Sequence, residues 1–374
     1  MKVSVVGGGN AGVFSALFLN HVIGAEVELI YDPTIPCERV GQATILDAPK
    51  ILYETIGFTW DNNPIHATFK SGVVYEGWGK VNDKVSNPFP PDRMGMHYCP
   101  WEMQNYVLNS GLFKVIEGKI DPKDVDADYV FDCRGKPDDF SDYHQIVNPT
   151  NAAILAKPNW DTSNVYWSRH VATPDGWTFV IPTALDSPSR SGSVGYCYNR
   201  NITSKEDAEK NMLEMFDVEI SKHINYNNYV SKEVVIDGRI ILNGNRLCFI
   251  EPLESSAIQT YSEVVLRFGR TLQLEGKLDN LNHQIHTYIK HIQNFVLWHY
   301  QFGSKYDTPF WDYAKKLTFN DHVFDSKLKE AIRLGWKDIH DNISLGKDTG
   351  YAYWDTGSFK YWYDGMTHFY KKGI

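Results

Sequence analysis

The first part of the chain contains two strand-like apolar runs on either side of a helix-like segment. Val3–Val6 is a short run rich in valine, and residues 13–22 carry apolar side chains at helical spacing. A second apolar run follows at Val27–Tyr31. Two strands joined by a helix in this order pair in parallel through a right-handed crossover. The pattern therefore predicts a βαβ unit in a parallel sheet.

Later segments show two further patterns. Asp128–Asp132 is a candidate buried strand, and between residues 164 and 200 polar residues alternate with aromatic and β-branched ones. This block predicts an antiparallel sheet with strands at Val165–Ser168, Trp177–Ile181 and Gly195–Tyr198. From Ile258 onward, apolar residues recur three and four positions apart. They predict two helices, at Tyr261–Leu274 and His283–Gln301.

These elements together predict an α/β fold. We expect residues 1–275 to interleave the parallel-sheet domain with an antiparallel layer at roughly residues 145–240. Residues 276–374 are expected to form a C-terminal helical cap. The chain contains no internal repeat, low-complexity tract or linker that would mark a sharper boundary. Its 374 residues suit one large domain or two interleaved ones.

Composition and charge argue against several classes of protein. The net charge of −9 leaves no basic surplus to neutralise phosphates, so we expect no nucleic-acid partner. The five cysteines are odd in number and lack a CxxC pair, which indicates reduced thiols. The sequence opens directly on strand-like residues, and no apolar stretch approaches the roughly 20 residues that a membrane span needs. We therefore expect a cytoplasmic protein without a membrane partner.

A metal site is not expected from the histidine pattern. Three histidines fall within one predicted helix, at His283, His286 and His291. Their spacings of three and five do not align all three on one face, and no acidic or cysteine residue sits at ligand spacing. These histidines are expected to form a polar helix face.

Three glycines between the first strand and the first helix form a GxGxxG loop. Gly7 permits a tight turn, Gly9 lets the backbone approach a pyrophosphate, and Gly12 allows close packing of the helix. The helix N-terminus adds N–H donors and positive potential. Asp32 follows the second strand, 20 residues past Gly12, where an acid binds a ribose hydroxyl. The loop favours dinucleotide binding, with a structural tight turn as the alternative.

Five further blocks in the chain resemble, in this order, the flavin-dependent halogenases, and in particular their compact viral-type members. They are VGQAT, the Lys70 strand ATFKSGVVYEGW, GWTFVIP, FIEPLESSAI, and NFVLWHY with DTPFW. The first four blocks begin at Val40, Ala67, Gly176 and Phe249. In the fifth, NFVLWHY begins at Asn294 and DTPFW at Asp307. The resemblance covers most of the chain and implies a flavin monooxygenase-like fold, with the antiparallel layer beside the substrate.

The resemblance implies FAD as the cofactor and makes residues 1–275 an FAD-binding domain. Two positions depart from the family. Gln42 stands where glutamate is usual, and Asp32 lies one position past the family's acid, where this chain has Tyr31. The residues that the resemblance assigns to the cofactor are Gly7, Gly9, Asn10, Ala11, Gly12, Asp32, Gln42, Ala43, Ser255 and Ile258.

The resemblance also assigns a catalytic amine to Lys70 and a catalytic carboxylate to Glu254. In this family, reduced FAD, O₂ and halide give hypohalous acid, which a lysine holds or converts to a haloamine and presents to an aromatic ring. Haloamine formation needs the neutral amine, so we expect a buried Lys70 with a lowered pKa. The Glu254 carboxylate would stabilise the cationic ring and accept its proton. Lys80 is the competing lysine, but it follows Trp78 instead of preceding it.

Two further departures concern the halide and the substrate wall. The resemblance implies halide binding by the backbone at Ser256 and Ala257. Ala257 replaces the family's glycine, which affects how closely a halide can approach the backbone. Phe179 in GWTFVIP replaces a tryptophan of the strand that separates substrate from flavin, so the indole N–H is lost while an aromatic wall is kept.

The implied function is FADH₂-dependent halogenation of a small electron-rich aromatic substrate, with O₂ and halide as cosubstrates. Because no NAD(P)H-binding module beyond the FAD fold is evident, a separate flavin reductase is the expected partner. Two alternatives stay open: a single-component flavin aromatic hydroxylase, and a catalytically silent flavin-binding protein. The arene, the halide and the oligomeric state are unassigned. Four aromatic residues of the cap could line a pocket or pack the cap, namely Trp354, Tyr361, Trp362 and Tyr363.

Overall fold

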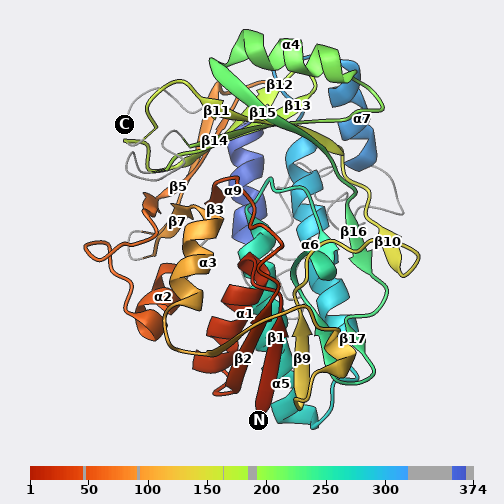
Figure 1. Cartoon of the computed structure of the whole chain (residues 1–374). Coiled ribbons are helices and arrows are strands. Elements are labelled where there is room, and N and C mark those ends of the chain that lie inside the picture. Colours follow the sequence, from red (N-terminus) through yellow and green to blue (C-terminus); the bar gives the residue numbers. More distant parts are fainter. Residues whose placement is uncertain (45–47, 91–92, 163, 184–191, 319–355, 368–374) are drawn as a thin grey trace.

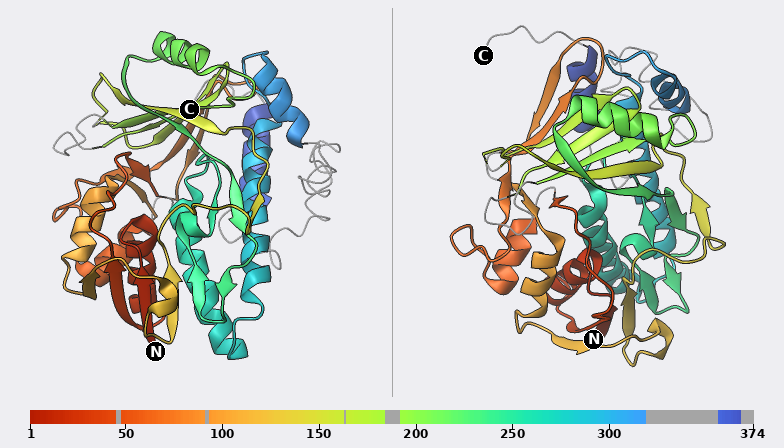
Figure 2. Two further views of the ribbon diagram at one scale, coloured as in Figure 1. Left: turned by 45° about the vertical axis from the view of Figure 1, so that its right-hand side comes forward. Right: turned by 45° about the horizontal axis from the view of Figure 1, so that its top comes forward.

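The computed structural model describes residues 1–44, 48–90, 93–162, 164–183, 192–318 and 356–367 (Figure 1). Two large sheets lie at opposite ends of the molecule, and long helices run between them (Figures 1 and 2). The mixed α/β fold predicted from the sequence is confirmed. In the described part of the chain, no helix is both long and apolar enough to cross a membrane.

A six-stranded sheet with the order β17-β18-β9-β1-β2-β8 forms one end of the molecule. Its members are β1 (Lys2–Val6), β2 (Glu26–Tyr31), β8 (Lys114–Glu117), β9 (Tyr129–Asp132), β17 (Val235–Ile236) and β18 (Ile240–Leu242). β1 pairs in parallel with both β2 and β9. Helix α1 (Asn10–His21) connects β1 to β2. The predicted βαβ unit and the strand predicted at 128–132 are therefore confirmed.

A seven-stranded sheet with the order β15-β11-β14-β13-β12-β5-β6 forms the other end, where α4 (Lys205–Met215) lies over it (Figure 1). Its strands are β5 (Gly72–Glu76), β6 (Lys84–Pro88), β11 (Ala152–Pro158), β12 (Ser168–Thr173), β13 (Gly176–Ile181), β14 (Ser193–Tyr198) and β15 (Val218–Asn225). Neighbours pair antiparallel, except β12 and β5, which are parallel. The predicted antiparallel sheet is confirmed, but two of its strands come from well before residue 145.

The strand predicted at Val165–Ser168 is wrong in position, because β12 begins at Ser168. Val165 N–H donates to Thr162 O in a turn, and Tyr166 O accepts from Ser71 N–H. These bonds occupy backbone groups that a strand ladder would need. Tyr166 and Trp167 stay 44% and 38% exposed, so the aromatic residues that suggested a strand here do not pack in a sheet.

Two three-stranded sheets complete the described strands. The first has the order β3-β7-β4 and contains β3 (Gln42–Ala43), β4 (Thr68–Lys70) and β7 (Gly95–Tyr98). The second has the order β10-β16-β19 and contains β10 (Tyr143–Gln145), β16 (Tyr229–Ser231) and β19 (Cys248–Phe249). Ser71 separates β4 from β5, so the strand expected within the block from Ala67 to Trp78 is instead split between two sheets. Gly72 permits the close approach at this break, since a Cβ there would lie 2.4 Å from Asn87 O.

The remaining described elements are helical. They are α2 (Ala48–Ile56), α3 (Pro100–Leu108), η1 (Pro122–Asp124), η2 (Gly244–Arg246), α5 (Ser256–Glu275), α6 (Leu281–Tyr300), α7 (Pro309–Thr318) and α9 (Thr356–Thr367). The two helices predicted from apolar spacing are confirmed as α5 and α6, although α5 begins earlier, at Ser256. Its C-cap is Gly276, whose φ of 67° is a left-handed conformation that glycine adopts without steric cost. The division into residues 1–275 and 276–374 stays a prediction.

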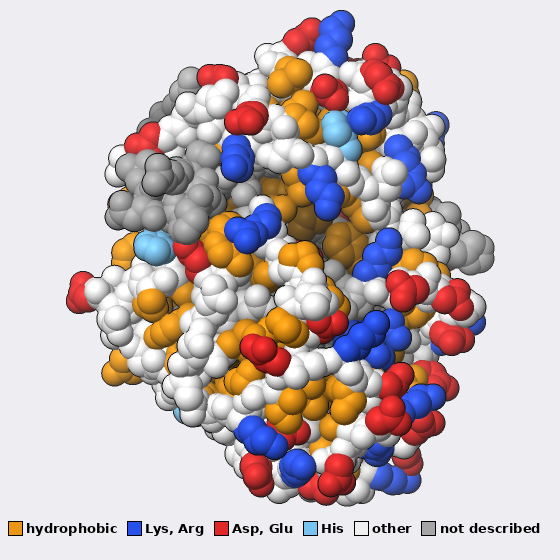
Figure 3. Space-filling model, in the orientation of Figure 1, with side chains coloured by type: hydrophobic (Ala, Val, Ile, Leu, Met, Phe, Trp, Pro, Cys, Tyr) orange, Lys and Arg blue, Asp and Glu red, His pale blue; other side chains and the backbone are white. Residues whose placement is uncertain are grey.

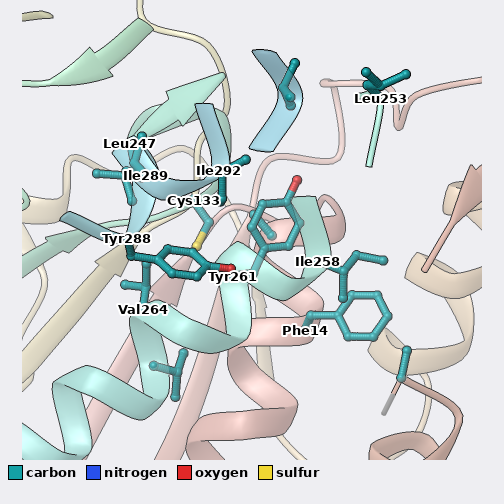
Figure 4. Close-up of a cluster of buried hydrophobic side chains, with 14 of the residues drawn as sticks. Phe14, Cys133, Leu247, Leu253, Ile258, Tyr261, Val264, Tyr288, Ile289 and Ile292 are labelled. Atoms are coloured by element: carbon teal, nitrogen blue, oxygen red, sulfur yellow. The ribbon is translucent and has the colours of Figure 1, made fainter. Parts of the chain in front are cut away.

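A core of buried apolar side chains joins α1, α5 and α6 (Figure 4). Phe14 of α1 lies beside Ile258 at the start of α5, and Tyr261 and Val264 continue the contact surface toward α6 (Figure 4). Burying each such side chain fully contributes about 1.5–3 kcal/mol. This packing fixes the first turn of α5 against the helix that follows the glycine loop.

Candidate active site

The glycine loop leaves the N-terminus of α1 open. A Cβ on Gly12 would lie 1.7 Å from Gly7 O, so the helix can pack this closely only with glycine at that position. Gly9 is the N-cap residue of α1. Because glycine has no side chain, no side-chain hydrogen bond caps the first turn, where Asn10 and Ala11 lie. A Cβ on Gly9 would meet nothing within 4 Å. No side chain caps the first N–H groups of α1, and there is room beside Gly9, as a pyrophosphate-binding helix requires.

Three polar atoms near this helix N-terminus are buried without a hydrogen-bond partner, namely Asn10 Oδ1, Tyr98 Oη and Gln259 Nε2. Tyr98 lies opposite Gln42 in the pairing of β3 with β7 and packs against Phe14 of α1. Gln259 belongs to the first turn of α5. Leaving a buried polar group unpaired costs about 1–3 kcal/mol. A cofactor with polar edges, bound between α1, β7 and α5, fits these atoms.

The VGQAT segment connects both halves of the molecule. Gly41 N–H donates to Ser193 Oγ of β14 over 2.8 Å. Gln42 Nε2 donates to Glu38 Oε2 over 3.4 Å, so a glutamate four residues earlier stands beside the glutamine that replaces the family's acid. Ala43 is buried in the same short strand.

Asp32 follows β2 at the carboxyl end of the parallel sheet. Its Oδ1 accepts from Thr34 N–H over 2.9 Å and from Thr34 Oγ1 over 2.6 Å. These two bonds, the one from the hydroxyl first, lower the pKa of the Asp32 carboxyl. Tyr31, in the family's acid position, donates its hydroxyl to Glu117. Asp32 is thus kept ionised at the place where a ribose would bind.

The surface is hollowed near the middle of the face seen in Figure 3. Hydrophobic side chains line the hollow, and lysine and arginine side chains stand around it (Figure 3). In the orientation shared with Figure 1, it lies between the seven-stranded sheet and the parallel sheet. Ligands of open α/β sheets bind outside the carboxyl ends of the strands, which is this region.

Lys70 is the last residue of β4 and is completely buried. Its Nζ donates to Ser255 Oγ over 3.2 Å and lies 5.4 Å from the ring centroid of Phe89. Burial lowers the pKa of the Lys70 amine to about 7, and the Glu254 carboxylate opposes part of that shift. The neutral amine is therefore well populated at neutral pH, as haloamine chemistry requires. Lys80, the competing lysine, instead pairs with Asp307 at the surface.

Glu254 lies beside Lys70, at the end of the EPLE segment, and is 8% exposed. The Tyr75 hydroxyl donates to its Oε1, and His299 Nε2 lies 2.9 Å from the same oxygen. Burial, followed by the charge of Glu254, raises the pKa of the Tyr75 hydroxyl well above its usual value. Tyr75 therefore stays a hydrogen-bond donor and orients the carboxylate.

The N-terminus of α5 contributes a second set of uncapped N–H groups. Ser255 is its N-cap, with a left-handed φ of 52°. Its side chain does not cap the helix, and Ser255 Oγ accepts from Lys70 instead. Ser256 is buried and Ala257 is exposed at this terminus. No acidic residue lies in the first turn, so the positive end of the helix dipole is not neutralised there.

The NFVLWHY block, to which the sequence analysis gave no catalytic role, contacts both glutamates of the EPLE segment. His299 approaches Glu254, and the Tyr300 hydroxyl donates to Glu251 Oε1 over 2.5 Å. Glu251 Oε2 accepts from Thr150 N–H and Oγ1. The resemblance to the family included this block but assigned no role to its residues. The helical spacing of the block predicted that His299 and Tyr300 lie on a helix, but not which residues they contact.

The GWTFVIP strand, β13, presents its aromatic residues to the same region. Trp177 is fully buried, with its ring centroid 5.1 Å from that of His170 and 6.1 Å from that of Phe179. Phe179 lies directly on Gly195 of β14, where a Cβ would come within 2.0 Å of the phenyl ring. The phenylalanine thus fills the aromatic wall without needing a partner for an indole N–H.

The cap residues and the helix histidines have different surroundings. Trp362 of α9 is buried, with its ring centroid 4.2 Å from that of Tyr75 and 5.1 Å from that of His299. Tyr361 and Tyr363 are partly exposed, and Trp354 lies outside the described residues. His286 contacts Ser231 O, and no cluster of three or more potential metal ligands occurs in the part of the chain that the structure describes.

Comparisons with known proteins identify the family of the chain. A family model described as tryptophan halogenase matches residues 2–112 and 119–334. The tryptophan 7-halogenase KtzQ of Kutzneria sp. (strain 744) is 22% identical over an alignment that covers 86% of this chain and 79% of KtzQ. The fold is similar to that of a tryptophan halogenase from Shewanella frigidimarina, with a TM-score of 0.77, 16% identity, and coverage of 99% of this chain and 89% of that one. BrvH, a flavin-dependent halogenase from Brevundimonas sp. BAL3, is similar with a TM-score of 0.73, 17% identity, and coverage of 98% and 90%. The chain belongs to the tryptophan halogenase family.

Proposed function

We propose that the chain is an FADH₂-dependent halogenase of small electron-rich aromatic compounds, with Lys70 and Glu254 as its catalytic residues. The observation that carries the proposal is a buried amine, with a pKa of about 7, beside a buried carboxylate from a distant segment. Hydroxylation by a flavin enzyme requires no such amine. Family membership independently favours halogenation.

The proposed FAD site follows the uncapped helix termini. Gly7, Gly9, Asn10, Ala11 and Gly12 would hold the pyrophosphate, and Asp32 would bind the adenosine ribose. Gln42 and Ala43 of β3, opposite Tyr98 and His97 of β7, would contact the flavin, as would Ser255 and Ile258 at the start of α5. The unpartnered buried atoms of Asn10, Tyr98 and Gln259 support a polar ligand in this place. The N–H groups at Ser256 and Ala257 would bind halide.

The chain's own residues perform the steps after halide oxidation. When bound, reduced FAD with O₂ and halide supplies hypohalous acid. The neutral Lys70 amine exchanges one N–H for an N–halogen bond and releases water. As the arene forms its new carbon–halogen bond, the N–halogen bond breaks and its electron pair stays on the Lys70 nitrogen, which takes up one proton to become the amine again, in balance with the proton lost from the ring. Glu254, held by Tyr75, accepts the ring proton.

Activity is expected to rise with pH through about 7. Because burial lowers the pKa of Lys70 to about 7, the ammonium predominates below this pH and the reactive amine above it. The measurement is kcat for halogenated product between about pH 6 and 9, with flavin oxidation followed in parallel. A rate that instead falls as pH rises through 7 would mean that the ammonium form holds hypohalous acid and that no haloamine is formed.

The reduced flavin is proposed to come from a separate flavin reductase. The GxGxxG loop is assigned to FAD, and no NAD(P)H-binding module beyond the FAD fold is evident in the sequence, which supports this proposal. Chemically reduced FAD is therefore expected to support turnover without a reductase.

The proposed function is tested by supplying purified protein with chemically reduced FAD, O₂ and a panel of indoles, phenols and other small arenes. Each arene is incubated with chloride, bromide and iodide separately, and products are identified by mass spectrometry. Halogen incorporation that depends on the protein supports the proposal. Oxygen incorporation without halogen would identify a hydroxylase, and FAD binding without product would identify a silent flavoprotein.

A further inference from the structure

His299 approaches the proposed base with a defined arrangement of its two ring nitrogens. The residue is fully buried in α6, and its Nδ1 lies 2.7 Å from Phe295 O in the preceding turn. A carbonyl oxygen only accepts hydrogen bonds, so Nδ1 carries a hydrogen. This bond leaves Nε2 to face Glu254 Oε1 at 2.9 Å.

The close Nε2 contact requires a proton on either His299 or Glu254. An unprotonated Nε2 would set its lone pair against a carboxylate oxygen at 2.9 Å, and the two would repel. The Tyr75 hydroxyl donates to the same Oε1, which marks this oxygen as an acceptor. Nε2 makes this close contact without the geometry of a directed hydrogen bond, and the attraction between two opposite charges does not need that geometry. The arrangement therefore favours an imidazolium beside a carboxylate.

Resting on the proposed function, we propose that His299 is a positioning residue whose positive charge balances Glu254 and thereby leaves Lys70 as the free amine of the site. The site holds one carboxylate and two basic groups in a buried volume. Burial penalises net charge, so one cation and one anion is the favoured state. With the charge on His299, the amine that must react with hypohalous acid is not held as an ammonium.

The other titratable groups that face this cluster are neutral. His97 of β7 and His170 of β12 face Lys70, and burial holds the pKa of each well below its usual value. Tyr75 of β5 stays protonated because its pKa is raised. Among the described residues packed around the cluster, the charge is therefore distributed over Lys70, Glu254 and His299.

The test is the protonation of Lys70 in the full chain, followed by NMR of isotope-labelled lysine Cε signals and assigned with Lys70→Arg. His299→Gln keeps an amide donor near Glu254 but cannot carry charge. In this variant Lys70 becomes the counterion of Glu254, so its pKa is expected to rise by about one unit or more, because an opposite charge within about 4–6 Å shifts a pKa by 1–3 units. The acid limb of the kcat profile is expected to move to higher pH by the same amount.

His286→Gln is the matched control, since it makes the same substitution on the same helix at a residue that contacts Ser231 O. It should leave the Lys70 titration unchanged. An unchanged Lys70 pKa in His299→Gln, or an equal shift in His286→Gln, would overturn the proposal. If His299→Gln does not fold, the NMR chemical shifts of the His299 ring nitrogens in the unaltered protein test the proposal instead. A neutral ring at pH 7 would contradict the proposal. The titration needs neither flavin nor arene, so its failure is distinct from failure of the halogenase function.

Discussion

Lys70→Met is expected to lower the yield of halogenated product about 10³-fold while reduced flavin is still oxidised. Methionine retains most of the side-chain volume in a site without exposed surface but cannot form an N–halogen bond. Hypohalous acid would then diffuse away or decay before meeting the arene in the right orientation. The measurement compares halogenated product with flavin consumed in the same reaction.

The same substitution is expected to stabilise the protein. The pKa of Lys70 is about 7 when folded, below its ordinary value of 10.5, so between these values the unfolded chain binds a proton that the folded protein lacks. The free energy of unfolding should therefore be higher when the pH is above the ordinary lysine pKa, and it should fall as the pH drops toward 7. Lys70→Met removes this penalty and should gain on the order of a few kcal/mol at neutral pH.

The matched control is Lys80→Met, at an exposed lysine paired with Asp307. Surface ion pairs contribute about 0–1 kcal/mol, so its stability and product yield should stay close to those of the unaltered protein. Chemical unfolding at neutral and alkaline pH, together with product analysis, tests both residues. Equal product yield from Lys70→Met, or a loss of stability at neutral pH, would contradict the assignment.

The parts of the fold that sequence could predict are those specified by neighbouring residues. The apolar runs at Val3–Val6 and Val27–Tyr31 and the apolar spacing in the segment that forms α6 predicted the element types correctly, because strand and helix patterns are local properties. The glycine loop could also be predicted from the sequence, because the spacing of its glycines is typical of a loop in which backbone atoms approach closely. The start of β12 was misplaced because backbone turns at Val165 and Tyr166 override the pattern of residue types.

The site itself was predicted only as far as the resemblance named residues. It named Lys70 and Glu254, and both are buried where the proposed chemistry needs them. It could not predict that Tyr75 and His299 both contact the Glu254 carboxylate, because Tyr75 lies on β5, His299 lies on α6, and Glu254 lies on neither element. Such contacts depend on how β5 and α6 pack, which periodicity does not encode.

Glu254→Gln is expected to lower kcat about 10²–10³-fold with little change in KM. Glutamine keeps the shape and the acceptor oxygen for Tyr75, but it cannot take up the ring proton or stabilise the cationic ring by charge. The Glu254 carboxylate raises the pKa of Lys70, so its removal favours the free amine. A loss of rate therefore cannot arise from a protonated Lys70 and must come from the steps at the ring.

Ring-deuterated arene separates this role from a general structural effect. With Glu254 present, loss of the ring proton follows halogen transfer quickly, so deuterium should leave kcat unchanged. Without the carboxylate, proton loss becomes slow, and a primary isotope effect on kcat should appear. Glu251→Gln alters the other buried glutamate of the same segment, which is bonded to Thr150 and Tyr300, and should cost stability without creating an isotope effect. Absence of the isotope effect in Glu254→Gln, or its appearance in Glu251→Gln, would assign proton removal to a group other than Glu254.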